Sequence, residues 1–213
     1  IAKGLTLKNE GAEIIDLGGQ SSRPGAKSVG AKEEWARIEP VLQGILERDP
    51  TTLISIDTYR SEVAYKAIHA GAAMINDISA GSLDPELFNV VAEADVPYVL
   101  MHMRGRPENM QNNLEYDDVV REVSDFFLQK TEELSGLGIK DVILDPGFGF
   151  GKSTADNYAM LANLEAFTKL KRPILVGTSR KSMICKALNV TPSEALNGTT
   201  VTHTWALERG ASL

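Results

Sequence analysis

The sequence has little cysteine, no long apolar run and no excess of basic residues. Cys185 is the one cysteine among 213 residues, which excludes an intramolecular disulfide and predicts a reducing compartment, the cytoplasm. No run of about 18 apolar residues and no basic-then-apolar leader is present, so neither a membrane span nor a secretion signal is expected. The net charge of -7 argues against a nucleic-acid partner. No His/Cys cluster has metal-ligand spacing.

Short apolar runs alternate with longer amphipathic segments along the chain. The runs are rich in Ile, Val and Leu and too short for helices, so they predict buried strands. They span Glu13–Gly19, Leu53–Thr58, Met74–Ser79, Tyr98–Met103, Val142–Gly147 and Ile174–Ser179. Apolar residues at helical spacing predict helices at Glu33–Arg48, Glu62–Gly71, Pro85–Asp95, Asp117–Gly138 and Ala155–Leu170. This alternation favours parallel strands joined by right-handed crossovers.

A Gly-Ala step recurs where predicted helices give way to strands, and it recurs near the end of the chain. By this analogy a further strand begins at Ala211, and Ile1–Lys8 is a helix whose preceding strand is missing. The six predicted strands, together with one strand implied before them and one implied after them, make eight strands. The sequence therefore predicts one α/β domain over residues 1–213, a (β/α)8 TIM barrel without its first and last strands. An open doubly wound sheet is the alternative.

Polar residues gather at the carboxyl ends of the predicted strands, where a barrel carries its active site. They are Asp16, Asp57, Asn76, His102, Asp145 and Ser179. Strand alternation points Ser55 and Asp57 into the barrel and places Asp145 on one face with Ile143. Each aspartate could instead cap a helix or brace a loop. For His102 a structural role is favoured over a catalytic one, and His69 and His203 fall within helical patterns.

The stretch Val142–Ser153, VILDPGFGFGKS, is similar to a phosphate-binding P-loop. Pro146 stands where the first glycine belongs, and a proline has no amide to offer a phosphate. The dinucleotide fingerprint fails as well, because Lys152 takes the place of its last glycine. We expect a loop whose glycines bring the backbone close to a ligand while its phenylalanines exclude water.

Two other loops follow strands and carry an arginine. Gly18–Ala26 is small, hydroxylic and flexible, which indicates either a mobile lid with an anion contact or a solvated turn. Thr178–Ser182 combines arginine, lysine and hydroxyls at the start of a helix, which predicts a site for an anion or an electron-rich ligand. A lysine at a barrel rim could also form a Schiff base, as aldolases do.

At these residues the sequence resembles the dihydropteroate synthase family, the pterin-binding enzymes of folate biosynthesis that sulfonamides block. The resemblance covers the whole chain. Six motifs carry it in order: Asp16–Gly25, Ser55–Thr58, Ile75–Ile78, Leu100–Met103, Leu144–Lys152 and Gly177–Ser182. It implies a (β/α)8 barrel and a homodimeric transferase that joins 4-aminobenzoate to 6-hydroxymethyl-7,8-dihydropterin diphosphate. Diphosphate leaves with the assistance of Mg²⁺, and 7,8-dihydropteroate is the product.

The resemblance also implies roles for particular residues. The implied catalytic residues are Asp57, Lys181 and Arg23. Lys181 is implied to bind substrate without forming a covalent intermediate. The pterin site is implied to consist of Asp57, Asn76, Asp145 and Lys181, with Asp145 accepting the two-donor edge of the pterin. Aminobenzoate is expected against Ser22, Arg23, Pro24, Phe150 and Ser182.

The chain departs from the family pattern in two respects. Ser22 stands where the family usually has threonine, so a methyl group is lost beside aminobenzoate. The family's metal-binding asparagine and its Arg-x-His pair for diphosphate belong to the missing first and last strands, so no metal ligand is expected in this fragment and the fragment alone need not be active. Three rivals stay open: a corrinoid methyltransferase domain, a pterin-binding homologue without activity, and a P-loop nucleotidase.

Overall fold

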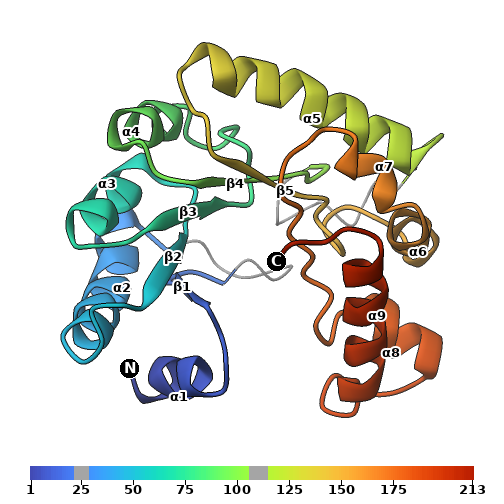
Figure 1. Ribbon diagram of the computed structural model, residues 1–213, viewed down its shortest axis with the longest axis horizontal. Helices are drawn as coiled ribbons and strands as arrows, with labels where there is room; N and C mark the ends of the chain where they lie inside the picture. Colours follow the sequence, from blue (N-terminus) through green and yellow to red (C-terminus); the bar gives the residue numbers. More distant parts are fainter. Residues whose placement is uncertain (22–28, 106–114) are drawn as a thin grey trace. The chain divides into compact units, whose positions relative to one another are not determined.

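A computed structural model describes residues 1–21, 29–105 and 115–213. Its five strands are β1 (Ile14–Gly18), β2 (Leu53–Asp57), β3 (Met74–Asp77), β4 (Tyr98–Met101) and β5 (Val142–Asp145), and helices separate them (Figure 1). The strands follow one another in one sheet in the order β1-β2-β3-β4-β5. A doubly wound sheet reverses its strand order at a switch point. No reversal occurs among the described strands, so the prediction of a (β/α)8 architecture is confirmed and the doubly wound alternative is wrong.

The segments predicted at Glu33–Arg48, Glu62–Gly71, Pro85–Asp95 and Asp117–Gly138 each form a helix, and the fifth predicted segment differs. The helices are α1 (Ala2–Asn9), α2 (Ala31–Leu46), α3 (Ser61–His69), α4 (Glu86–Ala94), α5 (Val119–Gly136), α6 (Thr154–Ala162), α7 (Glu165–Thr168), α8 (Ser182–Leu188) and α9 (Leu196–Glu208). The segment expected as one helix over Ala155–Leu170 is two, α6 and α7. The break lies at Asn163, whose side-chain amide donates to the Ala159 carbonyl at 2.8 Å. Asparagine competes with the backbone in this way and favours helix ends.

The chain divides into two compact units, and the first comprises Ile1–Leu100 with Glu133–Val142. Within it β1, β2 and β3 pair in parallel, with Ile15 beside Ile54 and Ile56 beside Ile75. The helices α2, α3 and α4 lie side by side along the strands (Figure 1). Ile54, Ile56 and Ile75 are fully buried, so the apolar residues of the central strands form the core of this unit.

The second unit comprises Met101–Glu132 with Ile143–Leu213. Its core contains the fully buried rings of Phe127, Phe148 and Phe167, and the first and last of these meet edge to face with centroids 5.9 Å apart. The amide of His102 donates to the Asp145 carbonyl at 2.9 Å, which ties the segment after β4 to the end of β5. The helices α6, α8 and α9 contact one another in this unit.

The strand expected at Ile174–Ser179 forms only one bridge, between Leu144 and Ile174. Backbone hydrogen bonds still form on both sides of this segment. The Leu175 amide donates to the Leu144 carbonyl at 2.9 Å, and the Val176 amide donates to the Leu213 carbonyl at 3.0 Å. The chain then turns toward α8 through Arg180, whose φ is 52°, so the extended segment stops short of a regular strand. Among the described helices, none is long and apolar enough to cross a membrane.

Candidate functional site

In the first unit the strand-end residues come together as the alternation predicts. Asp57 at the end of β2 lies in register with Asn76 of β3 and with Gly18 of β1. The Asn76 amide donates to the Asp16 carboxylate at 3.2 Å. Paired residues of parallel strands direct their side chains to the same face. Asp16, Asp57 and Asn76 therefore form one polar group, with two carboxylates and an amide that offers both a donor and an acceptor.

Burial shifts the pKa of Asp57 strongly. Desolvation raises it to about 7, and the negative charges of Asp16, Glu34 and Asp77 add to this effect. A carboxyl with such a pKa carries a proton part of the time at neutral pH. A cation or a set of N–H donors placed beside it would favour the ionised form. The group is therefore suited to respond to positive charge on a bound molecule.

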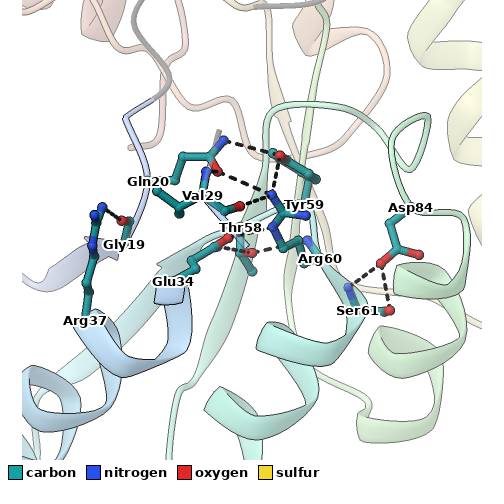
Figure 2. A network of polar contacts seen from close by, with 10 residues as sticks. All are labelled: Gly19, Gln20, Val29, Glu34, Arg37, Thr58, Tyr59, Arg60, Ser61 and Asp84. Atoms are coloured by element: carbon teal, nitrogen blue, oxygen red, sulfur yellow. Dashed lines mark hydrogen bonds and ion pairs between the residues drawn. The ribbon is translucent and has the colours of Figure 1, made fainter. Parts of the chain in front are cut away.

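A buried ion pair supports the end of β2, and sequence reasoning did not identify it. The Glu34 carboxylate, 1% exposed, accepts from Arg60 Nε at 2.9 Å and from the Thr58 hydroxyl at 2.6 Å. Figure 2 shows that the same guanidinium continues to the Val29 carbonyl, at 2.5 Å, and to the side chain of Gln20. Arg60 thus links α2, the loop after β2 and the described residues on either side of 22–28. The sequence signal for Glu34, an acid in the first turn of a helix, is typical of an exposed residue.

In the second unit Asp145 and Lys181 are electrostatic partners at the end of β5. The Asp145 carboxylate accepts from the Gly147 amide at 2.8 Å. Desolvation raises the pKa of Asp145, and the charge of Lys181 opposes the shift. Burial lowers the pKa of Lys181, and Asp145 in turn opposes that. Asp145 and Lys181 therefore interact electrostatically within one unit, and that they bind a pterin stays a prediction.

The loop after β5 surrounds Lys181 with backbone and aromatic groups. Lys181 Nζ donates to the Phe148 carbonyl at 2.5 Å and lies 4.9 Å from the centroid of the Phe150 ring. Phe148 is fully buried, while Phe150 is partly exposed. A partly exposed ring beside a cation is suited to contact a flat aromatic ligand. That Phe150 forms an aromatic wall of the aminobenzoate pocket stays a prediction.

The residues that make the loop similar to a P-loop have structural contacts. Lys152, 3% exposed, donates to the backbone carbonyls of His102, Gly147 and Phe150. Desolvation lowers its pKa to about 7, against the attraction of Asp145. Ser153 is the N-cap of α6 and shares a capping box with Asp156. With both side chains engaged in this way, a phosphate-binding role for this stretch has no support.

His102 and Arg180 do not face the polar groups as free functional side chains. Burial lowers the pKa of His102 to about 2, so its ring is neutral, and it packs edge to face on Phe126 at 4.9 Å. Its Nδ1 has no hydrogen-bond partner among the described residues. The Arg180 guanidinium donates to the carbonyls of Pro192 and Ser193. The ligand site expected at Thr178–Ser182 stays a prediction; Ser182 is exposed at the start of α8.

The contacts described above include neither the loop residues expected beside aminobenzoate nor a ligand for Mg²⁺. Ser22, Arg23 and Pro24 lie outside the described residues. Over residues 1–21, 29–105 and 115–213, no group of three or more His, Cys, Asp and Glu side chains is arranged to hold a metal ion. No residue is therefore assigned to Mg²⁺.

Comparison with known proteins gives a consistent result. The model of the pterin binding enzyme family matches residues 1–213. Dihydropteroate synthase of Escherichia coli strain K12 is 44% identical over 207 residues, which cover 96% of this chain and 73% of that protein. The solved dihydropteroate synthase of Xanthomonas albilineans with 4-aminobenzoic acid has a TM-score of 0.92 and 41% identity, covering 99% of this chain and 75% of that one. The structure of the same enzyme in complex with 7,8-dihydropteroate has a TM-score of 0.87 and 38% identity, and the match covers 99% of this chain and 75% of that one.

Proposed function

Because the chain belongs to the pterin binding enzyme family, we propose that it is a transferase that joins 4-aminobenzoate to 6-hydroxymethyl-7,8-dihydropterin diphosphate in folate biosynthesis. The products are 7,8-dihydropteroate and diphosphate. Support comes from the similarity to dihydropteroate synthases, one of which was solved with 4-aminobenzoic acid and with 7,8-dihydropteroate. The observation that carries the proposal is the partly buried Asp145–Lys181 pair at the end of β5, a match for a flat heterocycle with donors on one edge.

The pterin is recognised by the strand-end residues in this proposal. Its ring N–H and amino group are two parallel donors, which the Asp145 carboxylate accepts. One oxygen of that carboxylate already binds the Gly147 amide, but a carboxylate has about four acceptor sites, so both donors can be accommodated. Lys181 donates to the ring carbonyl. Asn76 meets the remaining polar edge with its donor and its acceptor.

Asp57 contributes to the chemistry in this mechanism. Diphosphate departs from the pterin methylene first, and the dihydropterin ring delocalises the positive charge that develops. Such a charge lowers the pKa of a nearby carboxyl, so Asp57, whose pKa is about 7 in the free protein, ionises and stabilises it. The aminobenzoate nitrogen then forms a bond to the methylene carbon in place of the broken C–O bond and loses one proton, which the released diphosphate or solvent accepts. Lys181 and Arg23 stabilise the negative charge of the leaving diphosphate.

Aminobenzoate is bound in this proposal by the Phe150 ring, by Ser182 and by Ser22, Arg23 and Pro24, the last three lying outside the described residues. Mg²⁺ would offset charge on the diphosphate, and no described side chain is assigned to it. Lys181 binds rather than forms a Schiff base. A borohydride-trapped adduct of substrate on Lys181 would contradict that role.

We also propose a cytoplasmic homodimer that binds small molecules and neither nucleic acid nor membranes. Free Cys185 suits a reducing compartment. The helices α8 and α9 expose large apolar side chains, among them Leu188, Leu196, Trp205 and Leu207. An exposed apolar surface of this kind is typical of an interface between copies of a chain.

Calorimetry of the natural full-length protein tests the pterin site. We expect Asp145→Asn to weaken binding of the pterin diphosphate by tens- to a thousandfold, because charge-assisted hydrogen bonds contribute about 1.5–3 kcal/mol each. Asp141→Asn is the matched control. It makes the same chemical change at an exposed position four residues earlier, and its affinity should equal that of the unmutated protein. Equal affinities for all three proteins would contradict the assignment of Asp145.

A further inference from the structure

Lys152 is a buried lysine that the proposed mechanism does not use, and the three carbonyls that accept from its Nζ favour the ammonium form against the desolvation that lowers its pKa. Its Nζ donates to the carbonyl oxygens of His102 at 3.1 Å, Gly147 at 3.0 Å and Phe150 at 3.0 Å. An ammonium group has three donors and no acceptor, so these contacts complete its hydrogen bonding. The side chain is 3% exposed. It therefore faces the interior of its own loop and leaves no donor for a ligand.

The three carbonyls belong to two segments that lie in direct contact. Gly147 has φ 68°, and a Cβ added there would stand 2.0 Å from the His102 carbonyl oxygen. Gly151 has φ 63°, and its Cβ would stand 2.5 Å from the Arg104 carbonyl oxygen. The glycine loop thus rests on the backbone of residues 102–104. Carbonyl oxygens that converge on one point repel one another, and the Lys152 ammonium group turns that repulsion into three charge-assisted hydrogen bonds.

The loop that Lys152 fixes carries the groups around Lys181. Phe150, whose carbonyl Lys152 binds, is the ring 4.9 Å from Lys181 Nζ. Phe148, two residues before it, supplies the carbonyl that Lys181 binds. Asp145 is held in addition through its own backbone, since its carbonyl accepts from the His102 amide at 2.9 Å, and the Lys152 charge lowers the pKa of its carboxyl without a hydrogen bond to it. Loss of the ammonium group should therefore displace Phe150 more than Asp145.

We propose that Lys152 is a positioning residue that orients the Phe150 ring, and through it the aminobenzoate, by binding three backbone carbonyls of the glycine loop. The proposal rests on the proposed function, because the contact of Phe150 with aminobenzoate belongs to it. It assigns Lys152 no contact with substrate. It predicts a selective effect: aminobenzoate binding depends on Lys152, and pterin binding depends on it much less.

The kinetic test uses Lys152→Met in the natural full-length protein, with Lys169→Met as control for loss of an exposed lysine. We expect the KM for aminobenzoate to rise at least tenfold in Lys152→Met, while the affinity for pterin diphosphate by calorimetry changes less than threefold. Lys169→Met should change neither. An unchanged aminobenzoate KM, or a pterin affinity that falls as much, overturns the proposal.

A double-mutant cycle separates action through Phe150 from general loosening. If Lys152 acts by orienting that ring, Phe150→Ala removes most of the effect of Lys152→Met. The double variant should then have an aminobenzoate KM within threefold of the worse single variant. Effects of the two substitutions that multiply would show independent action and overturn the proposal.

A measurement without substrate keeps this test distinct from that of the function. 4-Fluorophenylalanine at position 150 reports the surroundings of the ring by ¹⁹F NMR, and Lys152→Met should shift or broaden its signal while Lys169→Met should not. An unmutated protein that makes no dihydropteroate would remove the proposed function and leave this result standing. Coincident ¹⁹F signals overturn the proposal whatever the activity.

If Lys152→Met does not fold, Lys152→Arg takes its place, with about a threefold rise in KM expected because a planar guanidinium cannot meet three converging carbonyls.

Discussion

At the scale of single residues, the pKa of Asp57 links the site to stability. Folding raises this pKa from 3.8 to about 7, so the folded protein holds the proton more tightly than the unfolded chain. The resulting stabilisation is complete below about pH 4 and is lost as the pH rises to about 7. Asparagine mimics the protonated acid at every pH. We therefore expect Asp57→Asn to match the unmutated protein near pH 4 and to be more stable at pH 8, by up to about 4 kcal/mol.

Urea unfolding of both proteins at pH 4, 6 and 8, without ligands, measures this difference. Asp145, whose pKa is also raised, is present in both proteins and cancels in the comparison. Asp57→Asn should at the same time lower turnover, because the amide cannot ionise. Free energies of unfolding that run parallel across the pH range would show that Asp57 is not buried with a raised pKa.

The sequence predicts some of these residues and not others, for a physical reason. Asp57 and Asn76 follow from their positions at the carboxyl ends of predicted strands, and strand alternation also gives the face to which Asp57 points. Glu34 and Lys152 do not follow, because their burial depends on partners far along the chain. Glu34 needs Arg60, 26 residues later, and Lys152 needs the His102 carbonyl, 50 residues earlier. Local pattern cannot show that a charged side chain meets such a partner.

At the scale of elements, the glycine loop after β5 depends on close backbone contact. We expect Gly147→Ala to destabilise the protein by two effects, a positive φ of 68° and a Cβ only 2.0 Å from the His102 carbonyl oxygen. Gly138→Ala is the matched control, since its φ is 87° but its Cβ meets nothing within 4 Å. Backbone strain alone should cost about 1–2 kcal/mol in the control.

The close contact should add about 1–3 kcal/mol in Gly147→Ala beyond that control. Urea unfolding at one pH gives both values. Equal losses of unfolding free energy in the two variants would mean that the loop does not rest on residue 102. A further loss of aminobenzoate affinity in Gly147→Ala is expected, because Phe150 lies in the same loop.

Elements follow from the sequence where local and long-range preferences agree. The five strands from Ile14 to Asp145 lie within the predicted apolar runs, because Ile, Val and Leu there favour both extended backbone and burial. The run at Ile174 keeps extended pairing but only one bridge, since strand formation also requires regular partners on its sides. The break between α6 and α7 depends on one asparagine contact, which periodicity does not register.

At the scale of the whole molecule, strand order carries the fold assignment. The sequential order of β1 to β5 is what repeated right-handed β-α units produce. Asp57 and Asn76 belong to the first compact unit, and Asp145 and Lys181 belong to the second. That residues 1–213 act as one domain stays a prediction.

The homodimer can be tested through α9, where Val201 and Trp205 are 45% and 46% exposed one helical turn apart. They line a hollow of about 200 Å³ together with Leu188 of α8. A tryptophan in an interface often contributes 2 kcal/mol or more to binding. Trp205→Glu should therefore raise the dimer dissociation constant at least about thirtyfold, and folding should change little because the side chain is half exposed. Sedimentation of the natural full-length protein across a concentration series measures the constant.

Leu128→Glu on α5, where the leucine is 54% exposed, is the control for adding a charge to an apolar surface position and should leave association unchanged. A Trp205→Glu protein that dimerises as tightly as this control would show that α9 lies outside the interface.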